Sequence, residues 1–316
     1  MRHNALSAVR HQIFFLLQKH PKIISLAISC SIGFLTGLLC ISALTQTNQQ
    51  AGDFGWAIRA ANDILAGKDI YQHPFGNDLV PYPLPAAFFA LPLVMFSPSI
   101  AAGIFFGISS ALLAWCILQT QNKWLLLLFF SWPFAYSLLF VQWTPLIFCM
   151  AFMSPLLPLL LVKPQSVIPL LVLHPFSRQG IILLLLTGIV SLIIYPTWPF
   201  VWLGQISGYK GGTPPILSLP FGPILLLALF QYRKRKTWFF LLLAFMPQRV
   251  LYDQLALFLV ARSRGEAVFL AICSWITLPA LLIFDGWLGL PGGWQNWIVL
   301  TLYVPTLIIL LRQRES

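Results

Sequence analysis

Long apolar segments alternate with short polar passages along almost the whole chain. The first, 23–44, is apolar throughout and long enough to cross a hydrocarbon core of about 30 Å. The later apolar segments are 85–97, 100–120, 124–141, 144–162, 166–175, 181–195, 221–232, 238–246, 250–261, 267–284 and 298–311. At roughly 20 residues for each crossing, the pattern predicts an all-α polytopic membrane protein with about 10–12 transmembrane helices.

The composition agrees with this pattern. The chain has 316 residues, of which 59% are hydrophobic and only 9% are charged. Soluble domains contain about 25% charged residues. The longest polar passages are about 40 residues, too short to build a core of their own. We therefore expect 1–316 to form a single integral membrane domain.

The net charge of +11 results from basic residues that lie beside apolar segments. They form the run 233–236, the pair Arg262 and Arg264, and the pair Arg312 and Arg314. This is the positive-inside distribution, in which Lys and Arg contact the headgroups of membrane lipids. We therefore predict membrane lipids, and not nucleic acid, as the partners of these residues.

The same rule predicts the orientation of the chain. The basic segment 1–22 is expected to lie on the cytoplasmic face as a short amphipathic helix, and 23–44 to run outward. The polar loops 45–84 and 196–220 then lie outside the cytoplasm. Both termini are expected to be cytoplasmic, in a plasma (inner) membrane protein.

The first of these loops contains the most polar passage of the chain. The stretch 53–85 holds four of the eight acidic residues. Within it, 53–66 is predicted to form a helix in the membrane interface, with Asp53 capping its start and Gly67 ending it. The Pro-rich and Gly-rich part 73–85 is expected to be ordered but not helical.

Four polar sites lie beside or within apolar runs, where an ionisable group is costly and indicates a partner or a function. They are Asp53, Gln142, Lys163, and Arg249 together with Tyr252 and Asp253. Each also has a purely structural interpretation. Asp53 caps a helix, Gln142 bonds to a neighbouring helix, Lys163 extends to the membrane surface, and Arg249 pairs with Asp253 one helical turn away.

The sequence lacks the motifs that are typical of several kinds of chemistry. His73 and His174 are the only histidines after residue 20, and neither has a metal-ligand neighbour. The five cysteines lie singly in apolar segments. Nucleotide-binding glycine motifs and a nucleophile elbow are absent as well. We predict no metal and no cofactor. Carboxylates and aromatic side chains suit sugars, and cationic side chains suit phosphate. A lipid-linked sugar phosphate therefore fits the residue types present in this sequence.

A cluster of motifs in the first loop carries a resemblance to a known family. Its residues are Asp53, Phe54, Ala60, Ala61, Leu65, Gly67, Tyr71, Tyr82, Pro83, Leu84, Pro85, Pro92 and Leu93. In this order they resemble the GT-C membrane glycosyltransferases, in particular glycosyltransferase family 87, which uses polyprenol-phosphate mannose. Weaker likenesses follow at 141–143, 163–164 and 246–253. Val141 stands where the family pattern has glycine, and Leu84 where it has a second proline.

The resemblance implies a GT-C-like helical bundle and an inverting transfer of a mannose-like sugar from a polyprenyl-phosphate donor. The acceptor would be a lipid, a glycan or a protein on the extracytoplasmic side. Asp53 would be the general base, and Lys163, Arg249 and Arg59 would hold the phosphate. The remaining candidates for contact with substrate or lipid phosphate are Tyr82, Gln142, Tyr252, Asp253 and His73.

Two other classes of function fit the residues. A secondary transporter or flippase of a lipid-linked or anionic substrate would explain the interrupted apolar pair around Arg249, although no repeated half is evident. A non-catalytic subunit of a membrane complex would explain the short apolar segments, which would pack against a partner subunit.

Overall fold

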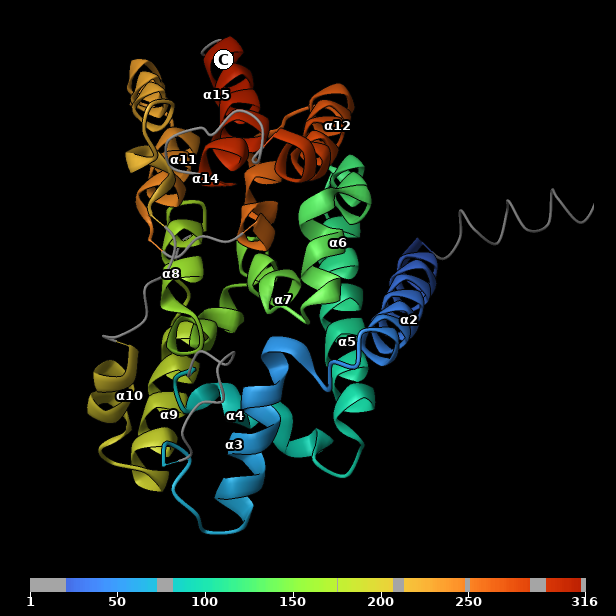
Figure 1. Ribbon diagram of the computed structural model, residues 1–316, viewed down its shortest axis with the longest axis vertical. Helices are drawn as coiled ribbons and strands as arrows, with labels where there is room; N and C mark the ends of the chain where they lie inside the picture. The colour runs from blue at the N-terminus through green and yellow to red at the C-terminus, as the bar shows by residue number, and fades with distance from the viewer. Residues whose placement is uncertain are drawn as a thin grey trace, which may run out of the picture.

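The computed structural model describes residues 21–72, 82–174, 176–206, 213–247, 251–284 and 294–313 (Figure 1). These residues form helices and connecting loops, without a β-strand. Most of the predicted amphipathic segment 1–22 and most of the turn-rich part 73–85 lie outside the described residues. So do two of the candidate site residues, His73 and Arg249.

Long apolar helices give the described part of the chain the character of an all-α membrane protein. Four are long and apolar enough to cross a membrane: α2 (Pro21–Gln46), α5 (Pro98–Leu118), Arg264–Leu282 and Gln295–Arg312. Arg264–Leu282 comprises α12 (Arg264–Pro279) and the start of η10 (Ala280–Phe284). Gln295–Arg312 comprises most of α14 (Trp294–Ile298), then η11 (Val299–Tyr303) and α15 (Val304–Arg312).

A fifth crossing is possible through a bent pair of helices. α9 (Arg178–Ile194) and α10 (Trp198–Ile206) pass the same test together, with a bend of 91° between them. α10 lies within the predicted outer loop 196–220, as does the short helix η7 (Pro215–Leu217). This loop is therefore partly helical.

The other predicted crossings are divided into short helices, so the described residues do not reach 10–12 full-length spans. These are η3 (Lys123–Phe130), α6 (Trp132–Leu139), α7 (Thr144–Phe148), η4 (Cys149–Ala151), η5 (Ser154–Leu161), α8 (Pro164–Val167), η6 (Ile168–Val172), η8 (Gly222–Gln231), α11 (Arg235–Phe245) and η9 (Leu251–Val260). Prolines at the starts of α6, α7, η5, α8, η6 and η8 cannot donate a backbone hydrogen bond, and 3₁₀ runs are usually short.

The two helices α2 and α5 pack against each other through glycines. A Cβ atom placed on Gly107 of α5 would lie only 2.7 Å from the backbone oxygen of Gly33 on α2. Small residues at such a contact let two membrane helices approach closely, which maximises their van der Waals packing. In Figure 1, α2 (blue) runs along the outer side of α5 (teal).

We expect Gly107→Ala to force α2 and α5 apart, because the new methyl group would meet backbone rather than a flexible side chain. Overpacking of this kind costs about 1–3 kcal/mol. Thermal unfolding of the purified protein should show a lower melting temperature. Gly188→Ala in α9 is the control, since a Cβ there meets only the Leu161 side chain at 3.7 Å. Equal melting temperatures for the two variants would contradict this packing.

The predicted helix of the first loop is present as η1 (Gly52–Phe54) followed by α3 (Gly55–Leu65). Its apolar side chains are buried against the protein, notably Trp56 and Ile58, and α3 contacts α4 (Pro85–Ala90) and η2 (Leu91–Leu93). Gly67 follows the helix with φ +64°, which glycine adopts readily. The capping prediction for Asp53 is wrong: Phe54 occupies the cap position, without a side-chain cap hydrogen bond.

Candidate functional site

The backbone of Asp53 is fixed by two neighbouring residues with left-handed φ angles. Gly52 has φ +52° and Val141 has φ +51°. Between them, the Asp53 N–H donates to the Phe140 carbonyl at 3.0 Å. For a β-branched residue such as valine, this conformation is strained, and such strain concentrates at functional sites. The segments 52–53 and 140–142 are thus locked together.

The Asp53 carboxylate is held by side chains and does not cap its own helix. Its Oδ2 atom accepts a hydrogen bond from Gln142 Nε2 and another, at 3.5 Å, from the Tyr82 hydroxyl. Tyr82 is itself anchored, because the Tyr71 hydroxyl donates to its carbonyl at 3.1 Å. These partners are tertiary contacts, and they take the place of the cap that the local sequence predicts.

Lys163 is buried and forms an ion pair. Its Nζ atom lies 3.2 Å from Asp253 Oδ1 and its side chain is only 6% exposed. The ammonium also lies 4.8 Å from the centre of the Tyr252 ring. The interpretation that Lys163 extends to the membrane surface is therefore wrong. Asp253 finds its cation 90 residues away in the chain, whereas Arg249 lies outside the described residues.

Gln142 connects these two groups. Its Oε1 atom accepts a hydrogen bond from Lys163 Nζ at 3.5 Å, while its Nε2 atom donates to Asp53. At the far end, the Ser166 hydroxyl donates to Asp253 Oδ1 at 3.1 Å. The result is a continuous row of polar side chains drawn from η1, the loop before α7, the residue before α8, α8 itself, and η9.

Most of the site residues predicted from the sequence therefore come together. The row and its immediate neighbours contain Asp53, Tyr82, Gln142, Lys163, Tyr252 and Asp253. Two contributors were missed. Ser166 follows Lys163 by three residues, a spacing that could have indicated it, and Tyr136 stacks on Tyr252 with ring centres 6.0 Å apart. No sequence signal marks Tyr136.

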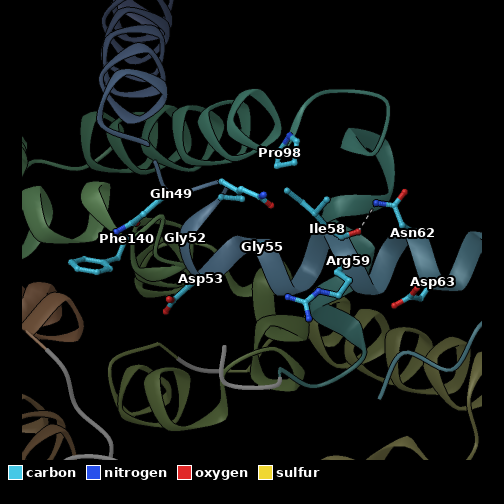
Figure 2. Close-up of a pocket in the computed structure, with 12 residues that line it drawn as sticks. Gln49, Gly52, Asp53, Gly55, Ile58, Arg59, Asn62, Asp63, Pro98 and Phe140 are labelled. Atoms are coloured by element: carbon cyan, nitrogen blue, oxygen red, sulfur yellow. Dashed lines mark hydrogen bonds between the residues drawn. The ribbon is translucent and has the colours of Figure 1, made fainter. Parts of the chain in front are cut away.

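A cavity of about 760 Å³ opens beside Asp53. It is lined by Gln49, Gln50, Ala51, Gly52, Asp53, Gly55, Ile58, Arg59, Asn62, Asp63, Pro98 and Phe140. In Figure 2, the side chains of Asp53 and Arg59 extend to the same side of the helix that carries them. The cavity therefore offers carboxylates, amides and a guanidinium to a polar ligand.

The Arg59 guanidinium is available to such a ligand. It forms no hydrogen bond or ion pair within the part of the chain that the structure describes. Arg59 lines the cavity from α3, as do Gly55, Ile58 and Asn62, which share one helix face by their spacing. Within the described residues, the guanidinium is thus not paired with a carboxylate at ion-pair distance.

The surroundings of Asp53 raise the pKa of its carboxyl above the ordinary value. The largest cause is burial, which penalises the ionised form, and the Asp253 carboxylate adds to it. The Gln142 hydrogen bond, the Lys163 charge and the Tyr82 hydrogen bond act in the opposite direction. A carboxyl with a raised pKa is a stronger base once it is ionised.

The described residues contain no group of three or more His, Cys, Asp or Glu side chains that could hold a metal ion. Comparisons with protein-family models, curated proteins and solved structures found no match to this chain.

Proposed function

We propose that the protein is a membrane glycosyltransferase that moves a mannose-like sugar from a polyprenyl-phosphate donor to an acceptor hydroxyl, with inversion, on the extracytoplasmic side. The observation that carries this proposal is the Asp53 carboxylate. It lines a cavity large enough for a sugar, and Gln142 and Tyr82 hold it in place. The GT-C bundle belongs to the same proposal.

The chemistry needs one base at this position. Asp53 takes the proton of the acceptor hydroxyl while the acceptor oxygen forms its bond to C1 of the sugar. The bond between C1 and the phosphate oxygen breaks, and the phosphate leaves with the electron pair. A lipid phosphate is a good leaving group, so a cation that holds it is sufficient. A positioned carboxylate of raised pKa suits the proton transfer.

The assignment of the cations changes with the geometry. Lys163 is neutralised by Asp253, so its charge is already used within the protein. Arg59 lines the same cavity as Asp53 and has a free guanidinium among the described residues. We therefore propose Arg59 as the principal phosphate ligand, and Arg249 stays a candidate from the sequence.

Arg59→Gln tests this assignment. Loss of a charge-assisted contact to phosphate is worth about 1.5–3 kcal/mol, which corresponds to a roughly 10- to 150-fold weaker interaction with the donor. We expect the KM for the donor to rise more than kcat falls. Arg178→Gln, a basic residue at the start of α9 that does not line the cavity, is the control. An unchanged KM in the Arg59 variant would remove Arg59 from the site.

The conformation of Val141 also supports the family resemblance. The family pattern has glycine at this position, and the left-handed φ of +51° is one that glycine adopts without strain. The valine therefore keeps the local backbone shape that a glycine would favour. This agreement is independent of the motif cluster in the first loop.

The direct experiment uses purified protein in lipid nanodiscs. A radiolabelled polyprenyl-phosphate mannose is supplied with a membrane extract as the source of acceptors, and the labelled products are separated. Transfer of label that depends on the protein supports the proposal. Absence of transfer from mannose, glucose and arabinose donors alike would overturn it.

One observation favours a second function. A buried ion pair such as Lys163 with Asp253 is costly in an apolar setting and often marks a transport pathway. A secondary transporter or flippase would move a labelled lipid-linked sugar across the bilayer of proteoliposomes and form no glycan product. The same donors therefore distinguish the two functions.

A further inference from the structure

The row of side chains behind Asp53 has a fixed direction. A glutamine amide presents an acceptor oxygen on one side and a donor NH₂ group on the other. Lys163 carries only donors, so it can bind only the oxygen of Gln142, at 3.5 Å. The NH₂ group must then face Asp53, which it contacts. Lys163 thus determines which group of Gln142 the carboxylate meets.

Lys163 is in turn held in place from several sides. Asp253 lies 3.2 Å from its ammonium, the Gln142 oxygen 3.5 Å, and the Tyr252 ring centre 4.8 Å. Ser166 fixes the Asp253 oxygen that receives the ion pair, at 3.1 Å. The ammonium therefore has little freedom to reach a ligand in the cavity, and neither Lys163 nor Asp253 lines that cavity.

A stabilising role alone accounts poorly for this arrangement. Removing two charges from water costs several kcal/mol for each ion, and their attraction repays that cost only with excellent geometry. A buried ion pair is therefore weak evidence for stability. The ion pair lies next to Gln142, which itself contacts Asp53. This placement gives the pair a role besides stability.

We propose that Lys163 and Asp253 are positioning residues, which fix the Gln142 amide and through it the orientation of the Asp53 carboxylate, and that they are not ligands of the substrate. This inference rests on the proposed function in one respect, the role of Asp53 as the general base. The coupling of Lys163, Gln142 and Asp53 can be measured without any transfer reaction.

The coupling has a definite sign. Among the described residues, the groups that face Asp53 are Tyr82, Tyr136, Gln142, Lys163 and Asp253, with Arg59 along the cavity. The Lys163 charge lowers the pKa of Asp53 and the Asp253 charge raises it. Removing the cation should raise that pKa, and removing the second carboxylate should lower it.

The test follows the protonation of Asp53 directly in the full-length protein in nanodiscs. Dicyclohexylcarbodiimide modifies carboxyl groups that carry a proton, and mass spectrometry of peptides locates the modification. The extent of modification at Asp53 is measured against pH. We expect Lys163→Met to move the midpoint upward and Asp253→Asn to move it downward.

A purely structural role predicts something else. Variants that merely loosen the fold would move both midpoints toward the value of an exposed aspartate, in the same direction. Shifts of the same sign, or none, would overturn the inference. If transfer occurs, the acidic limb of its pH profile should move with the midpoint in each variant. Opposite midpoint shifts without any transfer by the wild type would leave the coupling in place and remove the proposed function.

A charge-reversed double variant provides the matched control. Lys163→Asp combined with Asp253→Lys restores an ion pair, so folding should recover relative to the single variants. The new carboxylate at 163 would then attract the NH₂ group of Gln142 and turn it away from Asp53. We expect the midpoint to stay above the wild-type value. Its full return to that value would mean that the pair serves only to stabilise the fold.

Discussion

Asp53→Asn is expected to reduce transfer by roughly 100- to 10,000-fold, the contribution of a positioned general base. Asparagine has nearly the same shape and still offers an oxygen to Gln142 and Tyr82, but it cannot take up the proton of the acceptor. The measurement is kcat for transfer from a radiolabelled polyprenyl-phosphate sugar. The KM for the donor should change little, because the proton is taken from the acceptor.

This variant should fold normally. The pKa of Asp53 is raised in the folded protein, so the folded state binds the proton more tightly than the unfolded state does. Its contribution to stability is then present below the unfolded pKa and is lost as the pH rises through the folded pKa. Asparagine resembles the neutral form of the carboxyl, which burial favours, so the substitution should not lower the melting temperature. Glu266→Gln, a carboxylate-to-amide change in α12 away from the cavity, is the control for transfer. Full transfer by the Asp53 variant would contradict the base assignment.

The sequence alone identifies much of the candidate site because polar groups are conspicuous in an apolar chain. Gln142, Lys163 and Asp253 each stand out against the hydrophobic residues around them, and a buried ionisable group needs a partner. What the sequence does not contain is the identity of the partners. Local spacing pairs Asp253 with Arg249, which lies outside the described residues, and it gives no sign of Lys163, 90 residues earlier, beside which the carboxylate lies.

The same distinction applies to Asp53. An aspartate just before a helix is typically a cap, and this local preference is a sound expectation. Here the tertiary contacts with Gln142 and Tyr82 prevail over it. For the spans, hydropathy identifies the apolar segments, but it does not show that prolines divide several of them into 3₁₀ and short α-helices. The number of full-length helices therefore could not be predicted from segment lengths.

The second large effect is expected at Gly52, the residue that places Asp53. Gly52→Ala would meet two separate penalties. A left-handed φ of +52° costs a non-glycine residue roughly 1–2 kcal/mol. In addition, the new Cβ would lie 2.6 Å from the Phe140 oxygen, a backbone atom that already accepts the hydrogen bond of Asp53. Relieving that contact would separate segments 52–53 and 140–142, and with them Asp53 from Gln142.

We therefore expect Gly52→Ala to lower the melting temperature and to reduce transfer nearly as much as Asp53→Asn does. Gly67→Ala separates the two penalties, because Gly67 also has a left-handed φ, +64°, but nothing lies within 4 Å of its Cβ position. That control should show only the backbone cost and retain transfer. If the two glycine variants behave alike, the contact with Phe140 does not position Asp53. If Gly52→Ala alone loses transfer, the position of the Asp53 carboxylate depends on the close packing of segments 52–53 and 140–142. The row from Gln142 to Asp253 requires this packing, because it brings Asp53 to Gln142.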